Sequence, residues 1–280
     1  MKYKIEKNTV QETLIIPLYA RKVCSELYPN LYRDETAVRL IDEIDYDFSE
    51  AEKNSRGLMQ RFGSLEVAVR QNDLAFEVRD YLKSHPNAAV VNLGCGLDST
   101  GRSCDNGSCK IYNLDFPDVI AVRNELLPAG EREENIPCDL NNTEWFGKID
   151  SSNGAVFFAS GVFYYFLTEQ VKALVQGMAD AFPGGVLVFD AANRTAVKMI
   201  AKTWLKSAKI QDVGAYFAVS DAPQEISAWD SRLQVTSRGY MLGYTDLKDP
   251  SVSRFFRFLA KVGDGMMKMQ IVKIRFGGKQ

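Results

Sequence analysis

Short apolar runs alternate with helical segments through the middle of the chain, and this alternation constrains the fold more than any other feature. The runs read AAVVNL, KIYNLD, GAVFFAS and VLVFDAA, and they begin at residues 88, 110, 154 and 186. Strands that are apolar throughout and joined by helices are typical of a parallel sheet that helices cover on both faces. The sequence therefore predicts an α/β fold with a doubly wound, Rossmann-like and mostly parallel sheet.

Two of the connecting helices have recognisable first residues. One begins at Pro117, which suits a first helical turn because proline lacks the N–H that would stay unpaired there. The other covers TEQVKALVQGMADAF, and we expect Thr168 to be its N-cap. Towards the C-terminus, RLQVTSRGYML, the helical segment SVSRFFRFLAKV and the alternating run KMQIVKIRF predict a sheet edge that ends in an antiparallel strand pair.

The first third of the chain is predicted to be helical. Asp34 can cap a helix that extends to Phe48, and a second helix covers about Ser64 to Lys83 before SHPN ends it. We therefore expect two parts, a helical N-terminal cap over residues 1–85 and a doubly wound domain over residues 86–280. A second ligand would bind between the cap and the strand ends.

Charge and hydropathy exclude several classes of partner. The 280 residues carry a formal net charge of −2, so we expect no nucleic-acid partner. The longest apolar runs are too short or too polar to span a bilayer, which predicts no membrane partner. The N-terminal stretch MKYKIEKNTVQE has no apolar signal core. These features predict a soluble, cytoplasmic protein.

Cysteine and histidine usage gives no metal site. The five cysteines are scattered, and His85 is the only histidine. We expect free thiols in a reducing compartment, with a bridge between Cys104 and Cys109 as the lesser alternative.

A glycine turn and an acid at the next strand end form the main candidate site. The first run ends in Gly94-Cys95-Gly96, which lets the backbone turn sharply and leaves no Cβ to block a ligand. Asp115 ends the following run, so its carboxylate is expected beside the turn, where it can accept hydrogen bonds from a ribose. The ring of Phe116 can lie against an adenine. The alternative is a glycine turn without a ligand and an aspartate that only caps the next helix.

The residues after the turn favour a nucleoside without phosphate. A dinucleotide site has a third glycine where Ser99 stands. Asp98 places negative charge where a pyrophosphate would bind a helix N-terminus. Both features count against NAD and suit S-adenosylmethionine, which carries adenine, ribose, a sulfonium cation and an amino-acid end.

At these residues the sequence resembles the leucine carboxyl methyltransferase family, and within it the bacterial branch that includes the tetracenomycin polyketide O-methyltransferases. The resemblance covers more than half of the chain, in the stretches VQETLIIPLYAR, IDYDF, VVNLGCGLDS, YNLDFPDVI, CDLNNTEWF and ASGVFYYF. It implies a class I methyltransferase fold and S-adenosylmethionine as the cofactor that donates the methyl group. The implied reaction is methyl transfer to a carboxylate or acidic phenol oxygen of a small, polyketide-like or aromatic molecule.

The resemblance also implies further cofactor-binding residues. Arg70 matches an arginine that grips the carboxylate of the methionine moiety, and a planar guanidinium suits that task. Asp139 and Leu140 match a pair that contacts the adenine end of the cofactor. The alternative is that Asp139 is only a helix N-cap and Leu140 only a core residue. Ser160 stands where many members carry a glutamate, so the role of that glutamate is open here.

The acceptor site is less defined. Its candidates are four residues that contribute aromatic surface or a positive charge: Tyr19, Arg21, Tyr164 and Tyr165. Arg21 can meet an acceptor carboxylate, or it can pair with an acid of the cap. His85 precedes the first strand and is expected to be structural, so no His/Asp dyad is visible and the catalytic residues stay unassigned. An acceptor oxygen that is already acidic needs the least help, because a free phenol has a pKa of about 10.

Three other functions remain open at this point. A nicotinamide-dependent Rossmann oxidoreductase would share the glycine turn and the strand-end acid. A protein that binds S-adenosylmethionine without catalysis would explain Ser160. Methylation of a protein C-terminus is a variant that family analogy allows. The sequence does not predict an oligomeric state.

Overall fold

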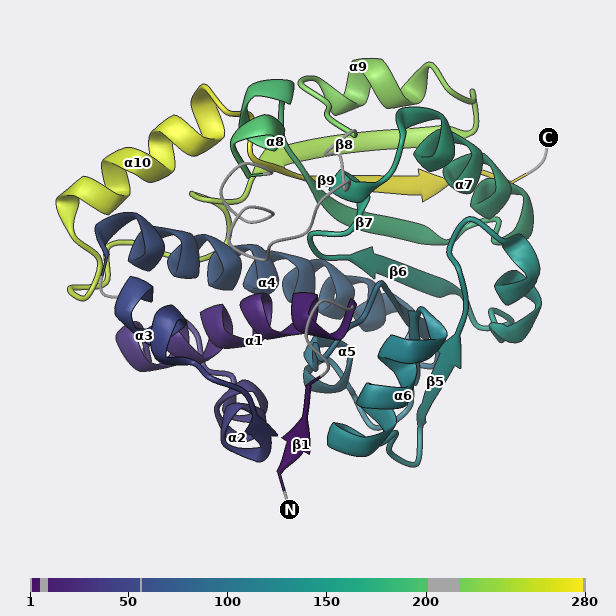
Figure 1. Cartoon of the computed structure of the whole chain (residues 1–280). Coiled ribbons are helices and arrows are strands. Elements are labelled where there is room, and N and C mark those ends of the chain that lie inside the picture. The colour runs from purple at the N-terminus through teal and green to yellow at the C-terminus, as the bar shows by residue number, and fades with distance from the viewer. Residues whose placement is uncertain (1, 6–9, 56, 201–216, 279–280) are drawn as a thin grey trace.

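The fold is a seven-stranded sheet between two layers of helices. The computed structural model describes residues 2–5, 10–55, 57–200 and 217–278. Within these residues the main sheet has the strand order β5-β4-β3-β6-β7-β9-β8, which in Figure 1 leads from β5 at the lower right to β8 at the top. The strands are β3 (Ala89–Leu93), β4 (Lys110–Asp115), β5 (Glu133–Pro137), β6 (Ala155–Ala159), β7 (Val186–Ala191), β8 (Leu233–Gly239) and β9 (Gln270–Phe276).

Strand directions match the sequence prediction. The five strands from β3 to β7 are parallel, β9 runs antiparallel to β7, and β8 pairs antiparallel with β9. The predicted α/β class and the antiparallel C-terminal pair are therefore confirmed. The order reverses between β3 and β6, and in such open sheets ligands bind at this switch point, beyond the carboxyl ends of the strands.

Side chains of each strand alternate between two apolar cores. On one face, Val90 and Val156 pack with the helix α4 (Leu58–Ser84), which contributes Leu74 and Val78. On the other face, Val91, Tyr112 and Phe157 pack with α7 (Thr168–Ala181), α9 (Ala222–Ser227) and the 3-10 helix η1 (Thr143–Lys148). The continuous apolar runs of the sequence thus reflect strands that are buried on both sides.

The N-terminal helices form a third core at the edge of the sheet. Helices α1 (Val10–Leu27) and α2 (Glu35–Glu43) pack there with α6 (Pro117–Leu126). In Figure 1, α1, α2 and the short helix α3 (Ser49–Ser55) lie below α4. Helix α4, which lies within the proposed cap of residues 1–85, is itself a layer on the sheet. The division into that cap and a domain of residues 86–280 stays a proposal.

Some helix ends differ from the prediction, and one of them is the start of α4, at Leu58 rather than near Ser64. The helix that begins after Asp34 stops at Glu43 rather than at Phe48, because Ile44–Asp45 (β2) pairs with Tyr3–Lys4 (β1) as a short parallel ladder. The capping role of Asp34 is confirmed, since its Oδ1 accepts from the Ala37 N–H at 2.8 Å.

The predicted N-cap Thr168 is wrong by one residue. Leu167 is the N-cap of α7, and Thr168 is its first helical residue. The Oε1 atom of Gln170 accepts from the backbone N–H of Leu167 at 2.8 Å. The side chain of the third helical residue thus reaches back to the N-cap N–H, as in one half of a capping box. By contrast, Pro117 begins α6 as predicted.

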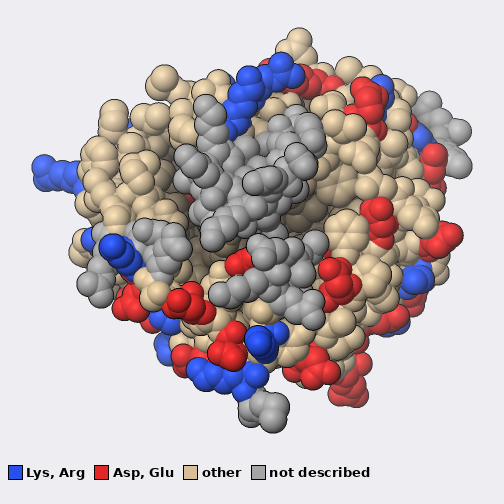
Figure 2. All heavy atoms as spheres, in the orientation of Figure 1, with Lys and Arg blue, Asp and Glu red and all other residues tan. Residues whose placement is uncertain are grey.

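The remaining elements are short. They are the helices α5 (Thr100–Ser103), α8 (Arg194–Ile200) and α10 (Arg254–Gly265) and the 3-10 helix η2 (Phe163–Tyr165). Basic and acidic side chains are interspersed over the face that Figure 2 shows. No helix in the described ranges is long and apolar enough to cross a bilayer.

Candidate functional site

The turn after β3 requires glycine at two positions. Gly94 has a φ of +65° and Gly96 a φ of +46°, both in the left-handed region that disfavours other residues. A Cβ at Gly94 would lie 2.6 Å from Cγ2 of Val162, in the segment after β6. The Cys95 N–H donates to the Leu114 carbonyl at 2.9 Å, which holds the turn against the end of β4. The turn therefore packs tightly between the ends of two strands.

The acid at the end of β4 lies directly beside this turn. Asp115 Oδ2 accepts from the Gly96 N–H at 2.8 Å, and Oδ1 accepts from the Phe116 N–H at 2.8 Å. Burial raises the pKa of Asp115 above its usual value, and the two backbone N–H groups oppose that rise. Each carboxylate oxygen still has a lone pair to offer. The Phe116 ring is 46% exposed next to them.

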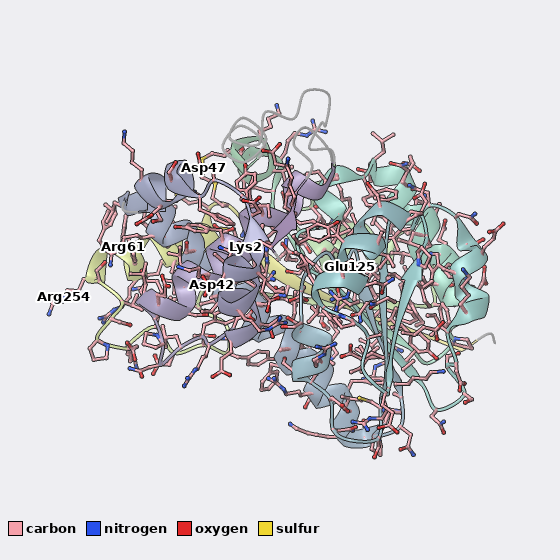
Figure 3. The ribbon with its side chains drawn as sticks, turned by 60° about the horizontal axis from the view of Figure 1, so that its bottom comes forward. Lys2, Asp42, Asp47, Arg61, Glu125 and Arg254 are labelled. Carbon is pink, nitrogen blue, oxygen red and sulfur yellow. The ribbon has the colours of Figure 1, made fainter. Side chains whose placement is uncertain are left out.

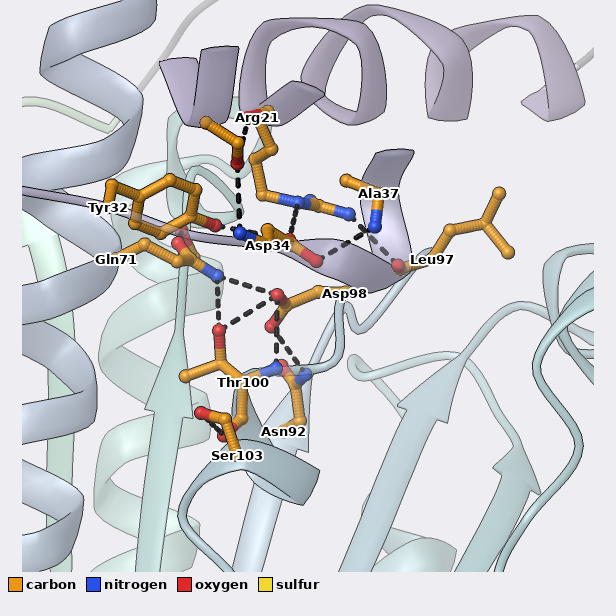
Figure 4. A network of polar contacts seen from close by, with 12 residues as sticks. Arg21, Tyr32, Asp34, Ala37, Gln71, Asn92, Leu97, Asp98, Thr100 and Ser103 are labelled. Carbon is orange, nitrogen blue, oxygen red and sulfur yellow. Dashed lines mark hydrogen bonds and ion pairs between the residues drawn. The ribbon is translucent and has the colours of Figure 1, made fainter. Parts of the chain in front are cut away.

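The buried acid Asp98 follows the glycine turn and links it to three neighbouring elements. Asp98 accepts from Gln71 Nε2 at 2.8 Å, from Asn92 Nδ2 at 3.1 Å and from Thr100 Oγ1 at 2.8 Å (Figure 4). Its carboxylate is thus fully engaged by α4, β3 and the start of α5. Asp98 therefore stands at the helix start, as the sequence predicts, but its carboxylate is buried.

A buried arginine holds the other side of the same loop. Arg123 Nη1 donates to the carbonyls of Gly96 at 2.9 Å and Asp98 at 2.7 Å. Arg123 is not among the site residues predicted from the sequence. Its signal was there, since it lies among the apolar residues Val119, Val122 and Leu126 of α6, where a charged side chain must find buried acceptors.

A second cluster lies where β6 and β7 end. Arg70 Nη1 donates to Asp190 Oδ2 at 3.1 Å, and the Gly161 N–H donates to Asp190 Oδ1 at 2.6 Å. Burial disfavours the charge of Arg70, but Asp190, the two tyrosines Tyr164 and Tyr240, and Glu66 together outweigh it and raise the pKa of Arg70. Next to this cluster, Ser160 Oγ donates to Gln71 Oε1 at 2.6 Å.

Asp190 is not among the site residues predicted from the sequence, although the rule that found Asp115 also applies to it. Asp115 ends its apolar run and Asp190 stands near the end of its own, and both runs become parallel strands. In such a sheet, all carboxyl ends meet at one edge. Gly94, Asp115, Ser160 and Asp190 therefore share the edge that carries the switch point between β3 and β6.

Asp139 and Leu140 follow β5 at the same edge. Asp139 is exposed, and its Oδ1 accepts from the Asn141 N–H at 2.9 Å, while Leu140 is buried. The Cys138 N–H donates to the Asp115 carbonyl at 2.8 Å, so the segment continues from the ladder of β4 and β5. Strand β4 thus separates the pair from the glycine turn.

The four candidate acceptor residues do not share one place. Tyr164 is buried beside the Arg70 cluster, and burial raises its pKa well above the usual value. Tyr165, its neighbour, is 49% exposed. Arg21 is buried, with Nε on Asp34 Oδ2 at 2.9 Å and Nη2 on the Leu97 carbonyl at 2.9 Å (Figure 4). Of the two roles that the sequence left open for Arg21, the structure shows the pairing with an acid of the cap, which is Asp34.

Tyr19 faces a separate cavity of about 640 Å³ among the N-terminal helices. Its ring stacks on Phe48 with 5.5 Å between centroids. Asp42 and Arg61, labelled in Figure 3, also line this cavity. No other candidate site residue lines it.

His85 lies far from the strand ends that carry these residues. It caps the C-terminus of α4, stacks on Tyr81 at 4.3 Å and precedes β3, at the opposite end of that strand from Gly94. The five cysteines are free thiols. Among the residues that the structure describes, no group of histidine, cysteine and acidic side chains is arranged to hold a metal ion.

Comparisons with known proteins show the family of the chain. The sequence pattern of the leucine carboxyl methyltransferase family matches residues 16–179, more than half of the chain. The tetracenomycin polyketide synthesis O-methyltransferase TcmP of Streptomyces glaucescens is 28% identical over 183 residues, which cover 65% of this chain and 66% of that protein, just under two thirds of its length. The S-adenosyl-L-methionine-dependent methyltransferase dpfgK of Gibberella zeae is 25% identical over 258 residues, which cover 86% of this chain and 85% of that protein.

Solved structures support the fold. A Thermobifida fusca protein assigned as a methyltransferase is 16% identical, with a TM-score of 0.57 over 92% of this chain and 94% of that one. A DUF574 family protein from Streptomyces avermitilis is 11% identical, with a TM-score of 0.58 over 93% of this chain and 97% of that one.

Proposed function

The chain belongs to the leucine carboxyl methyltransferase family, and from this premise we propose that it transfers a methyl group from S-adenosylmethionine to an oxygen atom of a small molecule. One observation carries the proposal. The carboxylate at the end of β4 is hydrogen-bonded to the glycine turn at the end of β3, and Arg70 lies at the same sheet edge with a buried Nε that has no partner within the described part of the chain.

The residues at this edge fit the methyl donor. Asp115 offers a lone pair on each oxygen to the ribose hydroxyls, and the exposed Phe116 ring offers a face to the adenine. Asp139 and Leu140 would border the adenine end. The unpartnered Nε of Arg70 is a donor for the carboxylate of the methionine moiety. S-adenosylmethionine itself supplies an electrophilic methyl group on a sulfonium.

Asp98 supports a methyl donor over a nicotinamide cofactor. Its buried carboxylate accepts from the Thr100 N–H at 3.2 Å, at the start of a helix of four residues. A pyrophosphate bound at this helix start would compete with Asp98 for the N–H groups of the first turn, and it would be repelled by the Asp98 carboxylate. The nicotinamide-dependent oxidoreductase is therefore the weaker alternative.

The acceptor is proposed to be a carboxylate or an acidic phenol of a polyketide-like or aromatic molecule. The only histidine of the sequence lies at the other end of β3, so the strand-end edge has no imidazole to remove a proton. Tyr164, whose pKa is raised by burial, stays protonated and can donate a hydrogen bond but does not act as a base. The relative named for tetracenomycin polyketide synthesis supports this acceptor class. Tyr164 and Tyr165 are the proposed acceptor contacts, and Tyr19 would take part only if its cavity serves the same ligand.

The proposed partner is thus a small molecule in the cytoplasm, with neither nucleic acid nor membrane involved. Isothermal titration with S-adenosylhomocysteine tests the donor site, and binding at micromolar concentrations is expected. No binding, together with a fluorescence change on adding NADH, would favour the oxidoreductase. Transfer of labelled methyl groups to a panel of aromatic acids and phenols tests the acceptor. Binding without any transfer would favour a protein that only binds the donor.

A further inference from the structure

We propose that Asp190 is a positioning residue, which fixes the guanidinium of Arg70 so that its Nε is presented to the amino-acid end of the methyl donor. The inference rests on the proposed function. It concerns a residue that does not touch the reacting atoms and acts through Arg70.

Asp190 is placed to be a rigid anchor. It stands near the end of β7, which is paired on one side with β6 and on the other with β9, and it is 2% exposed. Its two oxygens have different partners, the Gly161 N–H at 2.6 Å and Arg70 Nη1 at 3.1 Å. One carboxylate therefore ties the segment after β6 to a side chain of α4.

The free donor of Arg70 lies away from this contact. Arg70 Nη1 is engaged by Asp190, whereas Nε is buried and has no hydrogen-bond partner among the residues that the structure describes. A buried N–H without an acceptor is unfavourable, so its presence here calls for a ligand or another compensation. The carboxylate of an amino acid supplies an acceptor of the right charge, because a guanidinium binds carboxylates through parallel N–H groups.

Gly161 keeps the guanidinium accessible. Its φ is +71°, and a Cβ at this position would lie 3.4 Å from Arg70 Nη2. A larger residue would be strained at this φ, and its Cβ would lie in van der Waals contact with the guanidinium. The same residue donates its N–H to Asp190, so the backbone that approaches Arg70 is held by the same carboxylate.

The charges around Arg70 match a zwitterion. Asp190 and Glu66 are the two acids that act on its guanidinium, and Tyr164 and Tyr240 are the neighbouring phenols. Glu66 Oε1 accepts from the Tyr240 hydroxyl at 3.1 Å. One cation among two carboxyl groups complements a ligand that carries both a carboxylate and an ammonium group.

Two ligands separate this role from general stability. S-adenosylhomocysteine has the amino-acid end, and 5′-methylthioadenosine keeps the nucleoside but lacks it. We expect Asp190→Asn to weaken binding of S-adenosylhomocysteine on the order of tenfold, because the guanidinium is no longer fixed, and to leave the dissociation constant of 5′-methylthioadenosine unchanged. Both constants are measured by isothermal titration on the full chain.

Asp73→Asn is the matched control. Asp73 also bridges a backbone N–H, of Tyr244 at 3.0 Å, and an arginine, Nη2 of Arg238 at 2.7 Å, and it is on the same helix as Arg70. This variant is expected to leave the ratio of the two dissociation constants as in the wild type. If Asp190→Asn does not fold, Asp190→Glu replaces it. The longer side chain keeps the charge but shifts the guanidinium, so the same selective loss is expected.

The outcomes distinguish the inference from the proposed function. If the wild type binds S-adenosylhomocysteine and the Asp190 variant weakens both ligands equally, or neither, the positioning role is overturned while the donor site stands. If Asp190→Asn adds no further loss to Arg70→Lys, the two residues act as a unit, which supports the inference. If the wild type binds neither ligand, the proposed function fails and the inference with it.

Discussion

The carboxylate of Asp115 accepts a hydrogen bond from the Gly96 N–H over 2.8 Å, so the residue that ends β4 fixes the backbone of the turn that ends β3. These residues are neighbours because β3 and β4 are parallel and in register, with Leu93 opposite Leu114. The contact gives Asp115 two tasks. It stabilises a turn with positive φ angles, and it presents lone pairs at the edge where the proposed donor binds.

Replacing Asp115 by alanine is expected to weaken binding of S-adenosylhomocysteine. Loss of charge-assisted hydrogen bonds costs about 1.5–3 kcal/mol, which corresponds to roughly a tenfold to hundredfold higher dissociation constant. Titration calorimetry measures this constant. Asp118→Ala, an exposed acid in the first turn of α6, is the control and should bind as the wild type does. An unchanged constant for Asp115→Ala would remove this residue from the ribose.

Replacing Gly94 by alanine is expected to destabilise the fold for two reasons. The left-handed backbone costs about 1–2 kcal/mol for a residue with a Cβ, and contact with Val162 adds about 1–3 kcal/mol of overpacking. Gly107→Ala isolates the first cost, since Gly107 has a φ of +84° with open space around it. Denaturant unfolding compares the two variants. Val162→Ala should restore part of the stability of Gly94→Ala, and a lack of coupling would argue against the steric contact.

Replacing Arg21 by alanine is expected to lower the unfolding free energy by about 3–5 kcal/mol, because it leaves the buried Asp34 carboxylate without its cation. The side chains of this pair are 6% and 8% exposed. Lys22→Ala breaks the neighbouring surface pair with Glu26 and should cost less than about 1 kcal/mol. Chemical denaturation measures both. A small effect for Arg21, with altered acceptor selectivity, would instead indicate that it serves the substrate.

Asp73 is expected to make stability depend on pH between about 4 and 6. Burial raises its pKa to about 6, against the attraction of Arg238. Because the folded-state pKa lies above the unfolded value of about 3.9, the folded protein binds the proton more tightly, and stability falls as pH rises through this window.

Asp73→Asn removes this dependence. The unfolding free energy of the variant relative to wild type should therefore increase by about 2 kcal/mol from pH 4 to pH 7. Urea unfolding at several pH values measures the difference. Parallel curves for the two proteins would show that Asp73 does not titrate in this range.

The sheet and the glycine turn were predictable because their causes are local. Continuous apolar runs, a proline at a first turn and a Gly-x-Gly segment each act over a few residues, and the rules of parallel sheets then bring Gly96 and Asp115 together. The helix that starts after Asp34 shows the limit. Its apolar spacing continues to Phe48, but pairing of Ile44 with Tyr3 ends it early, and that partner is 41 residues away along the chain.

The contacts of the buried arginines were not predictable for the same reason. Arg70 and Asp190 are 120 positions apart, and Arg21 and Leu97 are 76 apart. Sequence spacing says that a buried cation needs an acceptor, but it does not say which one. The choice between a substrate and a cap acid for Arg21 depends on tertiary packing alone.

The bond from Arg21 to the Leu97 carbonyl joins helix α1 to the loop that follows the glycine turn. Separating the two would break a buried hydrogen bond from a charged donor and leave the Leu97 carbonyl without its partner. The helix that carries Arg21 is thereby anchored to the loop at which the methyl donor is proposed to bind, so a variant that weakens this hydrogen bond is expected to loosen both.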